Sequence, residues 1–230
     1  MRKISFLTIS LVAALFLVGA NSSAPVSPNS SHPLKPMMKR YKIKSGIIEY
    51  KLTGVNSGKE IVYFDNWGML EAKYTKTVMS MMGMTQKTNT LTLLDGEWTY
   101  NIDLDTNTGT KMATPLFQEL QKNAKNQDLT DVGKKMMEDM GGKKIGMEKL
   151  LGKLCEVWEI KAAYSKTWIW NGVAFKIEAG LGNMKMNSEA VSAKFNVPIP
   201  KAKVTLPKGA KIREMQNPMQ NRMMPGKMFK

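Results

Sequence analysis

Residues 91–102 read LTLLDGEWTYNI, and they decide the fold class of this chain. Leucine, threonine, tryptophan and tyrosine are typical of strands, and Asp95-Gly96 tolerates the positive φ angles that a two-residue type I′ turn requires. Residues 167–177, TWIWNGVAFKI, repeat this pattern around Asn171-Gly172. Each stretch therefore predicts a β-hairpin.

Further runs on both sides of these hairpins have strand composition and partial period-two alternation. Breaks that resemble turns separate them, among them Asn56-Ser57-Gly58 and Asn66-Trp67-Gly68. With the two hairpins they predict a meandering antiparallel sheet of about nine or ten strands. The runs are 41–53, 59–64, 69–78, 154–160 and 188–197.

Two short amphipathic helices are predicted to interrupt the strands. Thr114 can cap the first, with Pro115 at its first position, and Asp128 can cap the second, which Gly141-Gly142 ends. Each helix has one apolar stripe that must be buried, and we expect both stripes to pack on the concave face of the curved sheet. The stripes are Leu116, Leu120 and Ala124 in the first helix, and Leu129, Val132, Met136 and Met140 in the second.

The first twenty residues predict export. Arg2 and Lys3 precede an apolar run, and small residues end at Ala20, which is typical of a cleaved signal peptide rather than a membrane span. We expect a periplasmic or secreted protein that is soluble after cleavage near Ala20. The predicted division is a signal peptide at 1–20, a flexible Pro- and Ser-rich segment at 21–39, one domain at 40–212 and a flexible basic, Met-rich tail at 213–230.

The formal net charge of +15 favours anionic partners. No nucleic-acid motif is present, and the lysines are scattered rather than aligned on one helix. Together with the export signal, this pattern favours an anionic membrane surface or an envelope protein over nucleic acid as a partner.

No pattern in the sequence predicts catalysis. The single histidine, His32, lies in the Pro- and Ser-rich segment, so the domain offers neither a Ser-His-Asp triad nor a histidine-based zinc site. The single cysteine, Cys155, has no disulfide partner and is expected to be buried. Residues 103–109 superficially resemble a calcium loop, but the glycine comes one position late, so a hairpin turn is expected. We expect no enzyme and no cofactor.

Methionine is the compositional outlier, with 20 copies. Its thioether sulfur suits Cu(I), but flexible methionines also line adaptable apolar cavities or simply fill a core. The best candidates for a functional cluster are Met79, Met81, Met82 and Met84.

Several short stretches carry a family resemblance. They are GIIEY at 46–50, YFDNWG at 63–68, LDGEWTY at 94–100, GKLCEVW at 152–158, VPIP at 197–200 and LPKG at 206–209. Together they resemble the superfamily of periplasmic lipoprotein carriers and receptors of the LolA/LolB type and its relatives of unassigned function. Carriers of this type have an arginine in the barrel, whereas none of Arg2, Arg40, Arg213 and Arg222 lies in the predicted sheet.

The resemblance implies an unclosed β-barrel whose concave side is plugged by helices, with a cavity for acyl chains between the two. The predicted fold is thus mostly β (α+β), a curved antiparallel half-barrel with two inserted helices on its concave face. We expect a non-catalytic protein that binds a lipid, an acyl chain or another hydrophobic ligand. The alternatives are a periplasmic Cu(I)-binding protein and an envelope protein-interaction module. The expected cavity residues are Trp98, Leu116, Phe117, Leu120, Met136, Met140 and Trp168.

Overall fold

Strands dominate the part of the chain that the computed structural model describes, residues 38–81, 84–114, 128–181 and 184–215. This part holds one α-helix, α2 (Leu129–Asp139), and the short 3₁₀ turns η2 (Asn66–Gly68), η3 (Lys161–Ala163) and η4 (Lys201–Lys203). The strands are β1 (Gly46–Gly54), β2 (Asn56–Asp65), β3 (Leu70–Met81), β4 (Met84–Asp95), β5 (Trp98–Asp103), β6 (Thr108–Ala113), β7 (Lys143–Leu150), β8 (Lys153–Ile160), β9 (Ser165–Trp170), β10 (Val173–Leu181), β11 (Met184–Phe195) and β12 (Lys211–Glu214).

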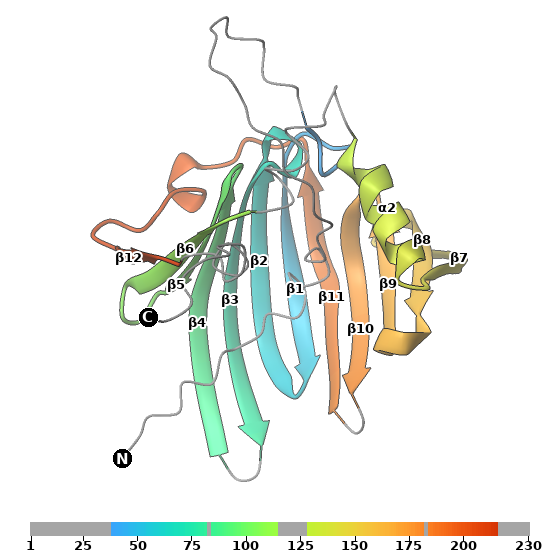
Figure 1. The fold of residues 1–230 in the computed structure, drawn as a ribbon, viewed down its shortest axis with the longest axis horizontal. Coiled ribbons are helices and arrows are strands. Elements are labelled where there is room, and N and C mark those ends of the chain that lie inside the picture. Colours follow the sequence, from blue (N-terminus) through green and yellow to red (C-terminus); the bar gives the residue numbers. More distant parts are fainter. Residues whose placement is uncertain (1–37, 82–83, 115–127, 182–183, 216–230) are drawn as a thin grey trace, which may run out of the picture.

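All twelve strands belong to one sheet, in the order β12-β6-β5-β4-β3-β2-β1-β11-β10-β9-β8-β7 (Figure 1). Neighbours are antiparallel, except that β12 runs parallel to β6. The two edge strands, β12 and β7, do not pair with each other, so the curved sheet stays open. The predicted fold class, a mostly β unclosed half-barrel with a helix, is confirmed.

Both predicted hairpins are present. Asp95 pairs with Trp98 across the β4–β5 turn, and Trp170 pairs with Val173 across the β9–β10 turn. Gly172 has a φ of 83°, as the type I′ interpretation of Asn-Gly requires. The turn expected at 103–109 also joins β5 to β6, and Oδ1 of Asp103 accepts hydrogen bonds from the backbone of the residues that follow.

The strand count and some boundaries differ from the prediction. Three strands were missed: β6 and β12 are short, and β7 is an edge strand whose residues are exposed except Leu150. Asn56-Ser57-Gly58 is the start of β2 rather than a turn. Glycine is needed at position 58 because β3 approaches closely there: a Cβ would lie 2.1 Å from the carbonyl oxygen of Lys76. Strand β12 (Lys211–Glu214) extends into the first two residues of the tail that was expected to be flexible at 213–230.

Helix α2 confirms the second predicted helix. Oδ1 of Asp128 accepts the backbone N–H of Thr130 at 2.9 Å, and Gly141, with a φ of 79°, follows the last turn. Lys134 forms an ion pair with Glu156 of β8 at 2.9 Å, which fixes the helix over that part of the sheet. The first predicted helix, like the signal peptide and most of the tail, falls outside the described residues.

The sheet packs two separate buried cores. On the convex face, Ala72, Leu91, Leu93 and Ile102 are at most 3% exposed, and Val204 from the segment after β11 packs on them. The second core lies mainly over β1, β2, β8, β9 and β10. Its most buried members are Ile48, Phe64, Cys155 and Phe175, so the expected burial of Cys155 is confirmed.

A buried carboxylate fastens the segment before β1 to the sheet. Glu71 of β3 is 3% exposed, and its Oε1 lies 3.5 Å from Nη2 of Arg40 and 3.4 Å from Nζ of Lys73. The Tyr41 hydroxyl donates a hydrogen bond to Oε2 of the same carboxylate. Burial alone would raise the pKa of Glu71, but Arg40 and Lys73 outweigh it and lower the pKa to about 2. Arg40, which lies outside the predicted sheet, therefore contacts a side chain of strand β3.

Replacing this carboxylate should destabilise the fold strongly. Glu71→Gln keeps the shape of the side chain but leaves Arg40 and Lys73 without their buried counter-charge. We expect the free energy of unfolding at pH 7 to fall by about 3 kcal/mol, measured by urea denaturation. The matched control is Glu189→Gln, whose carboxylate is more than half exposed and should change stability by less than about 0.5 kcal/mol. Equal effects of the two substitutions would contradict this assignment.

The same carboxylate gives stability a defined pH dependence. Because the folded-state pKa of Glu71 is lowered from 4.5 to about 2, its contribution is present above the unfolded pKa and is lost as pH falls from about 5 toward 2. The stability difference between the natural protein and Glu71→Gln should therefore shrink over this range. A difference that stays constant from pH 7 to pH 2, measured by urea denaturation at each pH, would show that Glu71 is not charged in the fold.

Candidate functional site

Helix α2 defines one face of the sheet, which we call the helix face. Strand register runs along it from Trp158 through Thr167, Ile177, Ser188 and Leu52 to Gly58, Thr77 and Thr88. Since paired residues of antiparallel strands point to the same side, this row crosses the whole sheet on the face that α2 covers. In Figure 1, α2 lies in front of β8 and β9 on this concave side.

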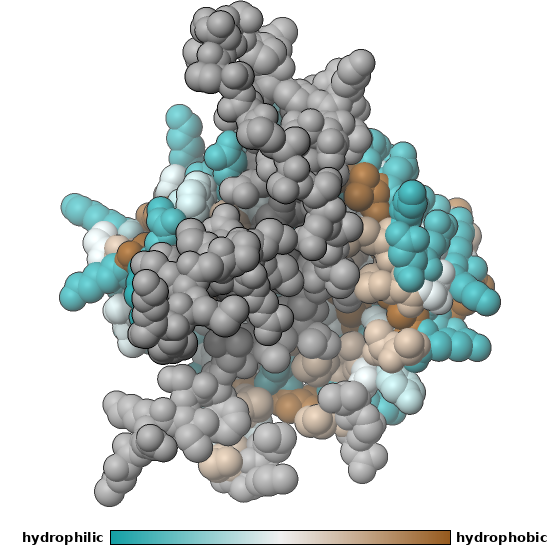
Figure 2. Space-filling model, in the orientation of Figure 1, coloured by the Kyte–Doolittle hydropathy of each residue, from teal (hydrophilic) through white to brown (hydrophobic). Residues whose placement is uncertain are grey.

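The helix face is apolar near α2. Trp158 and Ile160 of β8 are 6% exposed, and Ile169, Ile177 and Leu52 continue the surface as half-buried side chains. Figure 2 shows hydrophobic residues gathered on this side, below α2. The apolar stripe of α2 is also half-buried, whereas the exposed residues lie on the opposite side of the helix. The stripe is Leu129, Val132, Met136 and Met140; the exposed residues are Asp131, Lys135, Glu138 and Asp139.

The same face becomes polar over β3, β4 and β5. Register places Glu71 and Lys73 there, followed by threonines on all three strands. These threonines satisfy one another or a near neighbour: Thr77 and Thr88 are 2.6 Å apart, and Thr92 donates to Asn101 at 3.1 Å. The alternating threonines of 75–77 and 88–92 were the sequence signal for this polar half, which sequence reasoning missed.

The structure brings together only part of the expected cavity. Met136 lies on α2 and Met140 is the C-cap residue that follows it. Trp98 shares the convex face with Tyr100, beneath Nζ of Lys111 at 4.4 Å. Trp168 is 5% exposed, lies in register with Val157 rather than Trp158, and donates to Glu148 at 2.6 Å. Leu116, Phe117 and Leu120 lie outside the described residues. The tryptophan on the side of α2 is Trp158, which sequence reasoning missed.

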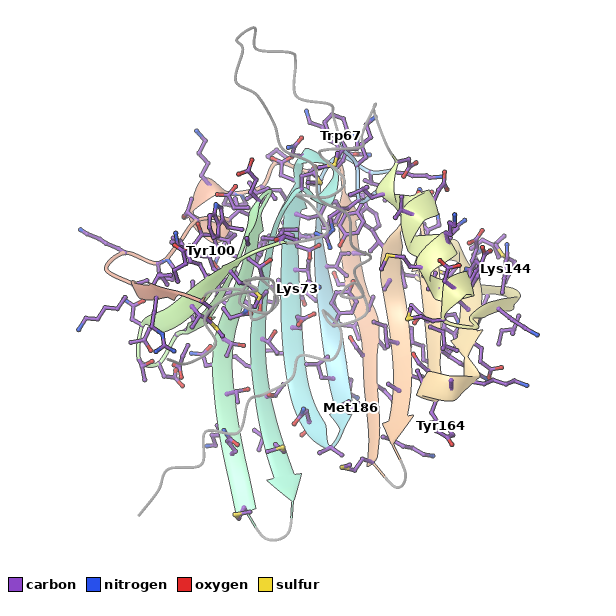
Figure 3. The ribbon with its side chains drawn as sticks, viewed as in Figure 1. Trp67, Lys73, Tyr100, Lys144, Tyr164 and Met186 are labelled. Atoms are coloured by element: carbon purple, nitrogen blue, oxygen red, sulfur yellow. The ribbon has the colours of Figure 1, made fainter. Side chains whose placement is uncertain are left out.

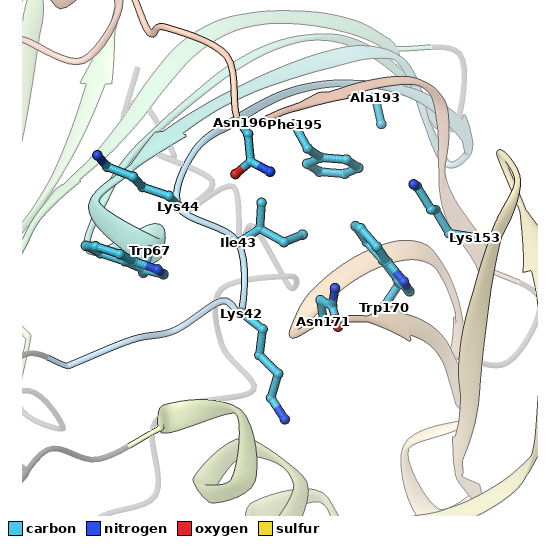
Figure 4. A pocket seen from close by; sticks show the side chains of 10 residues that line it. All are labelled: Lys42, Ile43, Lys44, Trp67, Lys153, Trp170, Asn171, Ala193, Phe195 and Asn196. Carbon is cyan, nitrogen blue, oxygen red and sulfur yellow. The ribbon is translucent and has the colours of Figure 1, made fainter.

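A pocket opens beside the first turn of α2, with a volume of about 660 Å³ (Figure 4). We call it the lysine pocket. The segment before β1, the turn after β2, the start of β8, the β9–β10 turn and the end of β11 all contribute to it. Its lining residues are Lys42, Ile43, Lys44, Trp67, Lys153, Trp170, Asn171, Ala193, Phe195 and Asn196.

Backbone hydrogen bonds fix the elements around the lysine pocket. The N–H of Lys42 donates to the carbonyl of Asn171 at 2.9 Å, and the N–H of Trp67 donates to the carbonyl of Lys44 at 2.9 Å. The Trp170 and Phe195 rings, whose centroids are 5.0 Å apart, connect the pocket to the buried core. Figure 3 shows Trp67 at the end of the half-barrel opposite Met186.

The methionine clusters occupy two separate hairpins. Met79 and Met84 belong to the β3–β4 hairpin, and Met184 and Met186 belong to the β10–β11 hairpin. Strands β1 and β2 lie between β3 and β11, which places those backbones about 14 Å apart. Met82 and the side chain of Met81 lie outside the described residues, so copper binding by this cluster stays a prediction.

No three histidine, cysteine, aspartate or glutamate side chains come together as metal ligands in the described part of the chain. Burial raises the pKa of Cys155, which keeps its thiol protonated and unreactive.

No helix among the described residues is long and apolar enough to span a membrane.

No protein-family model matches this chain, and no curated protein matches it in sequence. Solved structures do match. An uncharacterized conserved protein from Thermus thermophilus is 10% identical with a TM-score of 0.50, over 76% of this chain and 92% of that chain. PNGF-II is 12% identical with a TM-score of 0.39, over 78% of this chain but 33% of that chain. A domain described as an outer membrane lipoprotein-sorting protein, from Vibrio parahaemolyticus, is 8% identical with a TM-score of 0.26, over 71% of this chain and 90% of that chain.

These likenesses concern the fold alone. The uncharacterized Thermus thermophilus protein shares the open, curved sheet of this chain, so the half-barrel is confirmed as a fold. The resemblance to LolA and LolB stays a prediction. The chain spans about a third of PNGF-II, and nothing of that protein's activity is carried over.

Packing at Gly172 should hold α2 and the lysine pocket in place. A Cβ atom there would lie 2.5 Å from Cγ2 of Thr130 and 2.7 Å from the carbonyl oxygen of Arg40. Gly152, in the β7–β8 turn, has a similar positive φ of 75° but no atom within 4 Å of such a Cβ. We expect Gly152→Ala to cost about 1 kcal/mol of stability for backbone strain, and Gly172→Ala to cost about 1–3 kcal/mol more. Equal losses in urea denaturation would refute close packing at this turn.

Proposed function

We propose that this chain is an exported, non-catalytic protein that binds a lipid, an acyl chain or another hydrophobic ligand on the helix face of its half-barrel. The observation that carries the proposal is the change from apolar to polar side chains along that face. Half-buried apolar side chains continue from beneath α2 to Leu52, whereas β3 to β5 present hydrogen-bonded threonines. An apolar chain would lie against the first region and end at the second.

The energetics favour such a ligand. Each methylene that leaves water contributes about 0.8 kcal/mol, so burying a few carbons beneath α2 would give measurable affinity. Met136 and Met140 suit this role because an unbranched, polarizable side chain adapts to ligands of different shape. The hydroxyls of Thr75, Thr77, Thr88 and Thr92 already have hydrogen-bond partners on the sheet.

The export pattern of the first twenty residues gives the proposal its setting. A protein cleaved near Ala20 would work where lipids and lipoproteins must cross an aqueous space. The proposed location is therefore the periplasm or the exterior of the cell. An envelope protein or an anionic membrane surface is a proposed further partner.

Charges placed on the apolar stripe of α2 should abolish ligand binding. We expect Met136→Glu with Met140→Glu to weaken binding of 1-dodecanol at least 10-fold in native mass spectrometry of protein purified without detergent. The physical reason is the cost of burying a carboxylate against a hydrocarbon chain. Circular dichroism would confirm that the variant is folded.

The matched control lies on the same helix. Lys135→Glu changes an exposed position and should leave dodecanol binding unchanged. Retention of dodecanol by a folded Met136→Glu, Met140→Glu variant would overturn the proposed site.

A further inference from the structure

We infer that the lysine pocket binds the anionic head group of an amphiphile, such as a phosphate or carboxylate that carries an alkyl chain. This inference rests on the proposed function and names the class of ligand. It assigns the polar end of the ligand to the lysine pocket and the apolar end to the surface beside α2.

The first support is the positive charge of the pocket, which no carboxylate in its lining neutralises. Lys42, Lys44 and Lys153 line the pocket, and no carboxylate is among its lining residues. In the described part of the chain, Lys44 and Lys153 have no acidic partner within 4 Å, and Lys42 has a long, half-exposed contact with Asp128 at 3.8 Å. Six other lysines on the sheet and on α2 are, by contrast, paired with glutamates: Lys73, Lys111, Lys134, Lys144, Lys166 and Lys176.

Aromatic rings, rather than carboxylates, position two of these ammonium groups. Nζ of Lys153 lies 4.8 Å from the centroid of Trp170, and Nζ of Lys44 lies 5.9 Å from that of Trp67. A cation over a ring is held in place without losing its charge, so it can still bind an anion. The pocket therefore holds cations that are positioned and not neutralised.

Hydrogen-bond donors complete the polar end. Asn171 and Asn196 have φ angles of 50° and 54°, so both sit in fixed left-handed turns at the rim. Neither side-chain amide is hydrogen-bonded to another residue in the described ranges, and both are exposed. Amide N–H groups beside ammonium groups are suited to bind the oxygens of a phosphate or carboxylate.

The floor of the pocket explains why the ligand should be an amphiphile rather than a free anion. Ile43 is 5% exposed and belongs to the buried core, and the Trp170 and Phe195 rings pack beside it. A free phosphate would gain nothing from this apolar floor, whereas the first methylenes of a chain would be buried on it. The pocket volume of about 660 Å³ lies within the range of small-molecule sites.

The pocket adjoins the proposed chain site. Lys42 contacts Asp128, the capping residue of α2, and Gly172 next to Asn171 packs on Thr130 of the first helical turn. A head group in the pocket would therefore be placed beside the end of α2 from which the apolar stripe begins.

The test compares three probes on the full chain purified without detergent: dodecyl phosphate, 1-dodecanol and inorganic phosphate, each by isothermal titration calorimetry. We expect dodecyl phosphate to bind at least 10-fold more tightly than either other probe. Lys44→Glu with Lys153→Glu should remove this preference and leave dodecanol binding intact. The matched control is Lys51→Glu with Lys59→Glu, which changes the net charge equally at exposed positions on β1 and β2 and should keep the preference.

Each other outcome overturns the inference in a distinct way. Equal affinity for dodecyl phosphate and dodecanol would leave the proposed function standing and remove the head-group site. Equal affinity for dodecyl phosphate and inorganic phosphate would make the pocket a site for free anions. An equal loss in the control variant would show that net charge, not the pocket, attracts the phosphate. Binding of none of the probes would overturn both the inference and the proposed function.

Discussion

The carboxylate of Glu71 is the interaction on which the rest of the structure depends. It draws Arg40 and Tyr41 onto β3 and thereby holds the segment before β1 across the end of the half-barrel. That segment supplies Lys42, Ile43 and Lys44 to the lysine pocket and pairs through Lys39 with Asp128, where α2 begins. A buried charge is costly unless it is paired, so the position of this segment is specified by electrostatics as well as by packing.

The two faces of the sheet are covered by different parts of the chain. The convex face is closed by residues after β11, whose Val204 packs on a core of small and branched side chains. The helix face keeps apolar side chains half-buried near α2 and satisfies its polar groups elsewhere with paired threonines. The helix face also contributes Ile48, Val62 and Phe64 to a buried core, so its half-buried apolar residues near α2 border a packed region.

Local signals predicted much of this fold, and non-local geometry determined the rest. Asp95-Gly96, Asn171-Gly172 and the Asp128 cap were readable because each acts through its own neighbours. The side of the sheet that a tryptophan faces depends, by contrast, on strand register. Trp168 pairs with Val157, the neighbour of Trp158, so Trp158 and Trp168 face opposite sides and only Trp158 faces α2. The lysine pocket was not predictable, because its residues come from five separate parts of the chain. Strands β6, β7 and β12 lack an apolar alternation, and their partners define them.

The central claim is that the half-barrel holds an amphiphile with an anionic head group. Native mass spectrometry tests it most directly, on protein isolated without detergent from the cells that make it and again after incubation with a lipid extract of those cells. We predict a population whose added mass matches a single anionic amphiphile that accumulates when the extract is present. A bare chain in both preparations would contradict the claim.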